Sequence, residues 1–420
     1  MKKLLLVLVV FNSLNNIHAQ TNTLSLDSCM SYARNNFPMI KQLDLIQQIE
    51  HLNIRNINSS WLPSLLGTAQ FSYQSDVTSI NIPIPGFPTI EPPNKDQYKF
   101  FIDAGQVIYD GGTSKIQKNL ASSNSKSESY RVESEFYKIK EKVIQLYFGI
   151  LILQEQNKIL GLSLKDLDAQ LGKTKKAYEA NTVSGYQWNT IQAEKIKLDQ
   201  RIIETNTQLK VLLNNLSLIV GVNLSNFKEF LTPVELKNQA QLNRPEYKLF
   251  EIQKHVLDEQ NKLNNTKIIP KVALFAQGGY SNPALNFLKN EFEFYYLAGL
   301  KLNWNISSIY NRQREHSISI LNKNITQLQS ESFIYKLNLE KIQSEEDSKK
   351  FKQLMESDLS LVQLRVKIKE ASKLQYDNGI LTISDYIKDL NAEEQARTNE
   401  IIHKLSFLQS IYITNNIFGN

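Results

Sequence analysis

The sequence predicts an α+β membrane protein in which long α-helical hairpins accompany four transmembrane β-strands. Two features of its 420 residues lead to this class. Residues 113–178 contain no proline and have the mixed composition of a long helix, and residues 311–378 contain neither proline nor glycine. The first stretch would be about 100 Å long as one helix, which exceeds what an ordinary compact domain holds. Four further segments alternate between apolar and polar residues, as strands do.

The first twenty residues have the features of a secretory signal peptide. A basic start at Met1-Lys2-Lys3 precedes the apolar run Leu4 to Phe11, and the segment ends at Ala19-Gln20. This run is too short to span a membrane as a helix. We therefore expect residues 1–20 to be a signal peptide. Cys29 is the only cysteine, so no intrachain disulfide can form.

Composition argues against several classes of function. The formal net charge is +6, but lysines and glutamates are interspersed along the chain and no basic block favours nucleic-acid binding. The five histidines stand far apart without the spacing of metal ligands. The sequence contains no phosphate-binding glycine loop and no nucleophile motif. We therefore expect no catalytic residue, metal site, cofactor or nucleic-acid partner, and we expect no enzyme activity.

The mature chain begins with two short helices. Leu26, Met30 and Ala33 fall on one helical face, and Asn36 precedes Phe37-Pro38 as a plausible stop. A second helix is expected from about 39 to 59.

The period then changes from helical to two. Alternate positions from Leu65 to Tyr73 are apolar or small, and the interleaved Thr68, Gln70, Ser72 and Gln74 are polar. A second alternating segment runs from Tyr98 to Ile108. Five prolines in residues 75–97 predict an irregular loop between these strands. Gly111-Gly112 then turns the chain into the long helix.

The long helix contains an apolar patch from Val143 to Leu153. Eleven residues cannot cross a bilayer as a helix, so we expect burial among neighbouring helices. The helix ends near Tyr178. Asn181 can adopt the left-handed conformation that closes a helix, and Ser184 can cap the next one. The return helix runs to about residue 220 and stops at Gly221.

The same order of elements then repeats. Pro38 and Pro63 match Pro245 and Pro270 at an offset of 207, whereas Tyr178 and Gly221 match Tyr376 and Gly419 at an offset of 198. Repeat 1 comprises residues 21–230, with short helices, a strand pair about 64–109, a long helix about 113–178 and a return helix about 184–220. Repeat 2 comprises residues 231–420, with short helices, a strand pair about 271–305, a long helix about 311–378 and a return helix about 382–415.

Four strands of about ten residues match the length of transmembrane strands. They cannot close a barrel, because bacterial barrels need at least about eight strands. If the strands lie in a membrane, the chain must therefore share its barrel with other copies. The alternative is a small soluble sheet beside a coiled-coil stalk, since half-buried soluble strands also alternate.

Three motifs resemble those of the TolC-type outer-membrane efflux factor family. They are Leu26-Asp27 to Pro38, Asp110-Gly111-Gly112, and Tyr376-Asp377-Asn378-Gly379 followed by Thr382 and Asp385. The resemblance implies a homotrimer whose 12-stranded barrel takes four strands from each chain, with a periplasmic helical tunnel. It also implies an outer-membrane exit duct of a tripartite efflux pump or type I secretion system. Its partners would be a periplasmic adaptor protein, an inner-membrane transporter and outer-membrane lipid.

The resemblance further assigns two kinds of site. The adaptor-docking tips would be the two hairpin turns, Asn181, Thr182, Val183, Ser184 and Gly379, Ile380, Leu381, Thr382. A periplasmic gate would include Tyr376 and Asp385, with Lys388 in place of a second acid. Asp385 has a second interpretation, because an acid in the first turn of a helix is favoured by the helix dipole.

The chain departs from the family pattern at two turns. Asn181 replaces a glycine, and the second helix entry, Trp304 to Ile309, lacks the double glycine. A function of another class also stays open, namely a periplasmic coiled-coil adaptor or structural protein without a pore.

Overall fold

The computed structural model describes residues 23–79, 92–224, 227, 229–236 and 243–419. The expected signal peptide, residues 1–20, lies outside this described part of the chain. The chain forms two compact units. Unit 1 comprises Met1–Ile40, Glu135–Arg244 and Lys336–Asn420, and unit 2 comprises Lys41–Ser134 and Pro245–Tyr335. Each unit draws on both expected repeats, so the compact units differ from the repeats, and the division at residue 230 stays a prediction.

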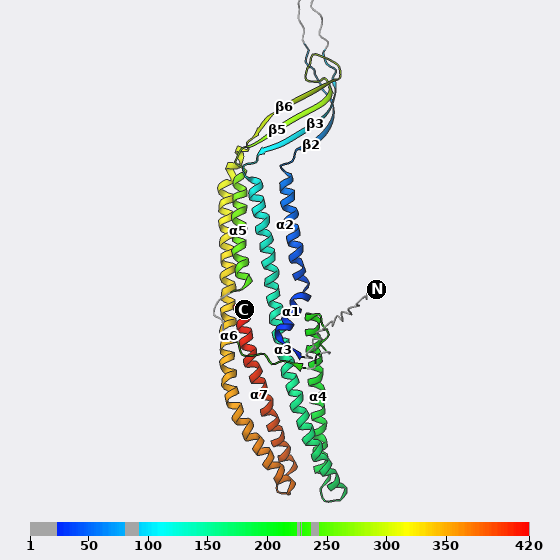
Figure 1. Cartoon of the computed structure of the whole chain (residues 1–420), viewed down its shortest axis with the longest axis vertical. Helices are drawn as coiled ribbons and strands as arrows, with labels where there is room; N and C mark the ends of the chain where they lie inside the picture. The colour runs from blue at the N-terminus through cyan, green and yellow to red at the C-terminus, as the bar shows by residue number, and fades with distance from the viewer. Residues whose placement is uncertain (1–22, 80–91, 225–226, 228, 237–242, 420) are drawn as a thin grey trace, which may run out of the picture. The chain divides into compact units, whose positions relative to one another are not determined.

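Unit 2 contains an antiparallel sheet of four strands in the order β2-β3-β5-β6 (Figure 1). The strands are β2 (Ser64–Tyr73), β3 (Asp96–Tyr109), β5 (Lys271–Asn282) and β6 (Glu293–Asn303). They lie where the alternating residues predict strands. In the described part of the chain, β2 pairs only with β3 and β6 pairs only with β5. The sheet therefore has two open edges.

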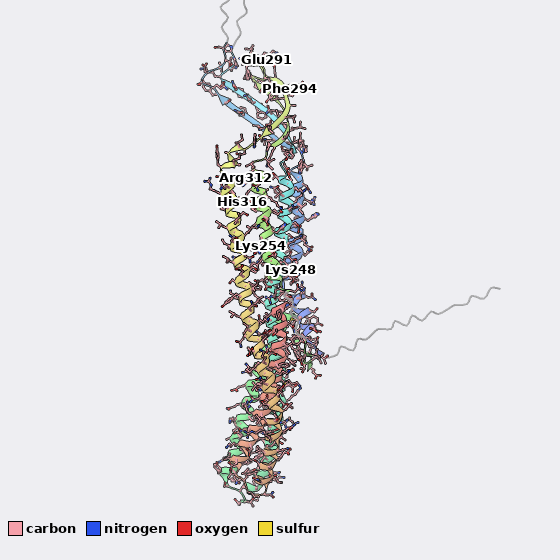
Figure 2. All side chains as sticks on the ribbon, turned by 90° about the vertical axis from the view of Figure 1, so that its left-hand side faces the viewer. Lys248, Lys254, Glu291, Phe294, Arg312 and His316 are labelled. Atoms are coloured by element: carbon pink, nitrogen blue, oxygen red, sulfur yellow. The ribbon has the colours of Figure 1, made fainter. Side chains whose placement is uncertain are left out.

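The strand register sorts the side chains into an apolar and a polar face. Phe100, Tyr280 and Phe294 stand in one cross-strand row on the apolar face. The rings of Tyr280 and Phe294 lie 4.6 Å apart, and Phe294 (Figure 2) is 87% exposed. On the other face Asp103 is opposite Gln277, whose Nε2 donates to Asp103 Oδ1 at 2.8 Å. An exposed aromatic face on a sheet requires a covering, which the described residues do not supply.

The first sheet-to-helix bend depends on two glycines and one aspartate. Gly111 and Gly112 have φ of 68° and 81°, which L-residues with a side chain rarely adopt. The Asp110 carboxylate accepts the backbone N–H of Gly112 at 2.8 Å and that of Ser114 at 2.6 Å. Asp110 thus satisfies donors at the start of α3 (Thr113–Glu179), which have no partner inside the helix.

The second sheet-to-helix bend, between β6 and the next long helix, contains no glycine. After β6, the short 3₁₀ turn η3 (Ile306–Ser308) leads into α6 (Ile309–Asp377). The Trp304 indole N–H donates to the carbonyl oxygen of Ile268 at 3.0 Å, which ties this bend to the end of α5 (Pro245–Thr266). Among the described residues Asn181 is the only non-glycine with positive φ, so a 3₁₀ turn replaces the left-handed pair here.

Helices complete both units. In unit 2, α2 (Gln42–Ser59), α5 and the first parts of α3 and α6 run from the sheet (Figure 1). Unit 1 contains α1 (Leu26–Asn36), the 3₁₀ turn η1 (Pro38–Lys41), whose last residue begins unit 2, and two helical hairpins. The hairpins join α3 to α4 (Gly185–Val220) and α6 to α7 (Ile383–Phe418). Gly221, with φ of 72°, ends α4 as the sequence predicts.

The core of unit 1 forms around the apolar patch of α3. Val143, Tyr147, Phe148 and Ile150 are all fully buried, which confirms the expected burial among helices. They pack with Leu216 of α4 and with residues of α7. The Tyr147 hydroxyl lies 2.7 Å from the carbonyl oxygens of both Leu24 and Leu231, and shares its one proton between them. It thereby links the helical core to the short parallel pair β1 (Thr23–Leu24) and β4 (Glu229–Phe230).

Replacement of Asp110 with alanine should lower the stability of the folded chain by about 1–2 kcal/mol. Burial alone would raise the pKa of Asp110, but hydrogen bonds from Ser114 and Gly112 lower it below its usual value. A lowered folded pKa adds stability above the unfolded pKa, and this stability is lost as the pH falls through the folded pKa. Thermal midpoints of the wild type should therefore fall more steeply with acid than those of Asp110→Ala. Equal acid slopes would contradict this role, and Asp44→Ala in exposed α2 serves as the control.

Candidate functional site

The turn between α3 and α4 closes with a left-handed residue. Asn181 has φ of 55°, which confirms the prediction for this position. Its N–H donates to the Tyr178 carbonyl at 2.9 Å, and the Thr182 N–H donates to the Ala177 carbonyl at 2.8 Å. These bonds satisfy carbonyl groups at the end of the helix that would otherwise lack a donor.

The turn between α6 and α7 has the same hydrogen bonds. Gly379 has φ of 73°, and its N–H donates to the Tyr376 carbonyl at 2.9 Å. The Ile380 N–H donates to the Gln375 carbonyl at 2.9 Å. Each donor and each acceptor of this turn lies 198 residues after its counterpart in the first turn. Ile380 is 75% exposed, so this turn presents an apolar side chain to solvent.

The two return helices begin differently. Thr382 caps α7: its Oγ1 accepts the N–H of Asp385 at 3.2 Å and donates to Asp385 Oδ2 at 2.6 Å. Ser184 occupies the corresponding N-cap position of α4, but its side chain makes no capping hydrogen bond. Ser184 therefore holds the N-cap position that the sequence predicts, but without the side-chain hydrogen bond that its residue type led us to expect. Leu381 and Val183 are half-buried beside these caps.

The three expected gate residues lie in different surroundings. Tyr376 is half-buried and stacks on Tyr386 of α7, with ring centroids 5.8 Å apart, and its hydroxyl lies 3.5 Å from Thr174 Oγ1. Asp385 and Lys388 are exposed, and no ion pair joins them in the described part of the chain. The structure thus shows Asp385 as an acid in the first turn of α7, bonded to the N-cap residue Thr382, while a gate role stays a prediction.

A buried phenol lies directly behind Tyr376. Tyr386 is fully buried, and its hydroxyl has no hydrogen-bond partner among the described residues. Burial, together with the negative charges of Asp166 and Asp377, raises the pKa of Tyr386 to about 12. Tyr386 therefore stays neutral at physiological pH and gives the end of the hairpin an apolar support.

Cross-helix ion pairs near this turn could not be anticipated from the sequence. Asp377 Oδ2 accepts from Lys173 Nζ on α3 at 2.9 Å, and Gln170 Nε2 lies 3.4 Å from Asp377 Oδ1. The bond from Lys173 lowers the pKa of Asp377 below its usual value. Asp377 directly follows Tyr376 in the motif. It lies 204 residues from Lys173 in the sequence, and only the fold brings the two side chains together.

A second group of charged residues joins α3, α4, α6 and α7. Lys369 of α6 lies 3.2 Å from Asp166 of α3 and 3.8 Å from Glu393 of α7, and Glu393 also pairs with Arg397. The neighbouring Glu394 pairs at 2.5 Å with Arg201 of α4. Both glutamates are less than one-tenth exposed. Burial removes water from these charges, which costs free energy. Only a well-placed partner of opposite charge offsets this cost, so loss of either partner should destabilise the fold.

Two other features are absent from the described residues. No described helix combines the length and apolar character that a membrane-spanning helix needs. Likewise, the described part of the chain gathers no group of three or more histidine, cysteine or acidic residues fit to hold a metal ion.

Comparison with known proteins identifies the class. Residues 30–222 match the family model described as outer membrane efflux protein. The chain matches no curated protein. Its fold resembles the Campylobacter jejuni CmeC outer membrane channel, with a TM-score of 0.69 and 18% identity over 94% of this chain and 85% of that one.

Two further solved structures share this fold. The outer membrane protein VceC from Vibrio cholerae matches with a TM-score of 0.68 and 11% identity over 93% of this chain and 95% of that chain. A membrane protein from Pseudomonas aeruginosa matches with a TM-score of 0.71 and 12% identity over 94% of this chain and 90% of that chain.

Residues 30–222 thus match the outer membrane efflux protein family by sequence, and almost the whole chain has the fold of outer-membrane channels. The TolC-type resemblance and the predominantly helical fold with a sheet are confirmed. The protein is an outer-membrane exit duct for efflux, located in the outer membrane with its helices in the periplasm. This family and fold are those of channel proteins, which are not enzymes.

Glu393→Gln should lower the free energy of unfolding by about 1–3 kcal/mol, because Lys369 and Arg397 would lose a buried partner. The control is Glu346→Gln on α6, whose pair with Lys349 at 2.7 Å is more than 60% exposed on both sides. Its loss should change stability by less than about 1 kcal/mol. Chemical unfolding of both variants measures the difference. Equal effects would show that this group of charged residues does not stabilise the hairpin.

Proposed function

We propose that three copies of this chain form one duct, with four strands from each copy in a 12-stranded barrel. A periplasmic adaptor and an inner-membrane transporter complete the export assembly. The observation that carries the proposal is the sheet with two open edges and one exposed aromatic face. In lipid, each unpaired backbone group costs several kcal/mol, so β2 of one copy must pair with β6 of the next.

The dimensions of the apolar face support its insertion in a membrane. Phe294 and Trp304 mark its two ends and lie ten residues apart. Ten residues extend about 33 Å, and at a strand tilt of about 40° this gives a band about 25 Å tall. Aromatic residues at both ends of such a band match the girdles at the two membrane interfaces.

The helices also present surfaces that fit other copies. Seven apolar residues of α6 are at least half exposed and fit the alternating three- and four-residue spacing of a coiled-coil seam, in which position 332 is a serine. They are Ile318, Leu321, Ile325, Leu328, Tyr335, Leu339 and Ile342. Such a seam packs against a second helix of the same character. This argues for helix contacts between copies that continue below the barrel.

The orientation follows from the loops. The segment from Pro83 to Pro93, most of it outside the described residues, would lie outside the cell. The turns at Asn181 and Gly379 would lie in the periplasm. These turns expose Thr182, Ser184, Ile380 and Thr382, with Val183 and Leu381 half-buried, and we propose that they meet the helical hairpins of the adaptor.

A membrane-impermeant thiol reagent tests this orientation. On whole cells, Ser79→Cys should be labelled and Thr182→Cys should not, because only the first residue faces the outside. The wild-type chain is the matched control: Cys29 is buried, and burial raises its pKa to about 12, so it should not react. Labelling of Thr182→Cys but not of Ser79→Cys would overturn the orientation. The adaptor interpretation predicts instead a soluble periplasmic protein, which fractionation detects.

The gate is the second part of the proposal. Three copies of Asp385 around one axis would concentrate negative charge at a constriction and favour cations. Lys388, three residues further on, would reduce this charge. Tyr376 would narrow the same opening, supported by Tyr386 and by the Lys173–Asp377 pair.

Single-channel recording on Asp385→Asn tests the gate. A gate acid predicts a lower preference for cations and weaker block by divalent ions. Since Asp385 also bonds to Thr382, the residue that caps α7, a change in stability alone cannot decide. Thr382→Val removes the same cap and keeps the charge, so it should leave selectivity unchanged. Wild-type selectivity in Asp385→Asn would remove Asp385 from the gate.

Gly379→Val should impair export while the duct still inserts in the outer membrane. Valine is strained at φ of 73° and adds bulk at the surface proposed to meet the adaptor. Nothing lies within 4 Å of the added Cβ inside the chain, so the fold itself has room for it. Efflux assays with inserted protein quantified in membranes measure the effect. Normal export at normal abundance would show that this turn does not dock.

A further inference from the structure

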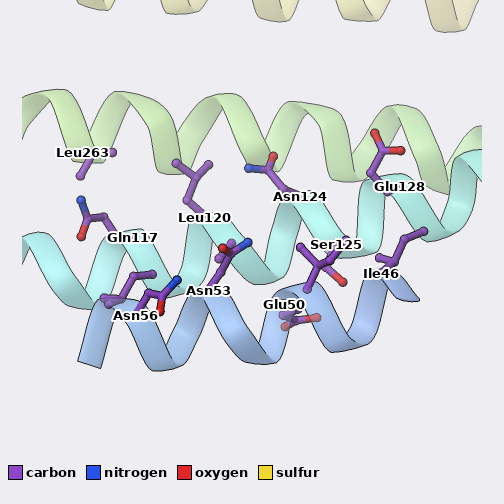
Figure 3. Close-up of a pocket in the computed structure, with 13 residues that line it drawn as sticks. Ile46, Glu50, Asn53, Asn56, Gln117, Leu120, Asn124, Ser125, Glu128 and Leu263 are labelled. Carbon is purple, nitrogen blue, oxygen red and sulfur yellow. The ribbon is translucent and has the colours of Figure 1, made fainter. Parts of the chain in front are cut away.

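Unit 2 contains a groove between α2, α3 and α5 with a volume of about 620 Å³ (Figure 3). The groove exists because α2 packs loosely: none of its residues is buried. Figure 3 shows side chains of α2 and α3 facing one another across it, with Leu263 contributed by α5. All lining residues belong to unit 2, so the groove is complete within that unit.

The lining combines an apolar surface with amide groups and negative charge. Isoleucines of α2 and Leu120 and Leu263 form the apolar part, and Asn53, Asn56, Gln117 and Asn124 supply the amides. The only ionisable groups in this lining are the carboxylates of Glu50 and Glu128. No lysine or arginine lines the groove. A ligand with negative charge is therefore disfavoured.

The two carboxylates are not equivalent. Glu128 is paired with Arg131 on the same helix, at 2.5 Å, and this pair is about half exposed. Glu50 is half-buried, and it has neither an ion-pair nor a hydrogen-bond partner among the described residues. Figure 3 places Glu50 at the end of the groove that also holds Ile46 and Ser125. Glu50 thus offers an uncompensated negative charge beside an apolar wall.

We propose that this groove binds a small organic cation with an apolar body, whose charged nitrogen pairs with Glu50. The volume falls in the range of about 300–1,000 Å³ that drug-sized ligands occupy. The isoleucine and leucine side chains would cover the apolar body, and the amides can accept or donate hydrogen bonds along it. Binding in the groove follows from its lining alone. The suggestion that such cations are exported cargo rests on the proposed duct function.

Fluorescence titration of the purified, detergent-solubilised protein tests the proposal. Berberine, an aromatic cation that brightens in apolar surroundings, serves as the cationic probe. N-phenyl-1-naphthylamine serves as the neutral probe of similar apolar character. Glu50→Gln should weaken berberine binding about fivefold, as expected for one partly exposed charge pair, and leave binding of the neutral probe unchanged. Detergent without protein provides the blank for both probes.

Two further variants distinguish the effect of filling the groove from the effect of removing a charge. Ala121→Trp should block both probes, because it fills the groove without altering Glu50. Asp44→Asn removes a carboxylate from α2 outside this groove and should leave both affinities unchanged. Circular dichroism and the mass of the assembly confirm that each variant keeps the wild-type structure.

Three outcomes would overturn the proposal. Equal berberine binding by the wild type, Glu50→Gln and Ala121→Trp would show that the probe binds elsewhere. Equal weakening of both probes by Glu50→Gln would show that charge is not recognised. No probe binding by the wild type, with loss of assembly in Ala121→Trp, would show that a second copy fills the groove. Failure of the duct function is separate, since it would appear as absence of the wild type from the outer membrane.

Discussion

The open edges of the four-stranded sheet are the constraint on which the rest of the structure depends. A strand in lipid can leave no backbone N–H or C=O without a partner, because no water is present to replace it. One chain pairs β2 and β6 on one side only within its described residues. The aromatic face formed by Phe100, Tyr280 and Phe294 adds a second demand, since it also needs an apolar covering. In the proposed trimer, lipid on the face and other copies at the edges would satisfy both.

The sheet-to-helix bends make the positions of the long helices depend on the positions of the strands. α3 begins four residues after β3, and α6 begins six residues after β6, so each helix continues directly from a strand. Asp110 with two glycines makes the first bend, and a 3₁₀ turn secured by Trp304 makes the second. A ring of strands therefore implies a ring of helices. The exposed seam of α6 from Ile318 to Ile342 is consistent with helices that meet those of neighbouring copies.

Local patterns in the sequence were sufficient to predict most of the fold. Alternation predicted the four strands, the proline-free stretches predicted α3 and α6, and turn chemistry predicted the left-handed Asn181. The bulge between Val107 and Tyr109 was missed, although the polar Gln106 and the apolar Val107 interrupt the alternation just before it. Ser184 was expected to cap α4 from its residue type, but its side-chain orientation depends on packing.

The candidate site was less accessible to sequence reasoning. The turns carry local signals, so Gly379 and Thr382 could be found. The pairs Lys173–Asp377 and Lys369–Asp166 join residues about 200 positions apart, and mixed charges on long helices are usually solvated. No periodicity distinguishes the buried Glu393 from the exposed Glu346. Only the packing of α3, α6 and α7 reveals which charges meet.

The mass of the folded protein in mild detergent tests the central claim most directly. If lipid-exposed edges force copies to share one barrel, native mass measurement should give three times the mass of one mature chain, which is 48.3 kDa less the expected signal peptide. Cysteines placed on β2 and β6 should then cross-link between chains and not within one chain. A folded monomer that stays stable in lipid, with both edges unpaired, would contradict the account.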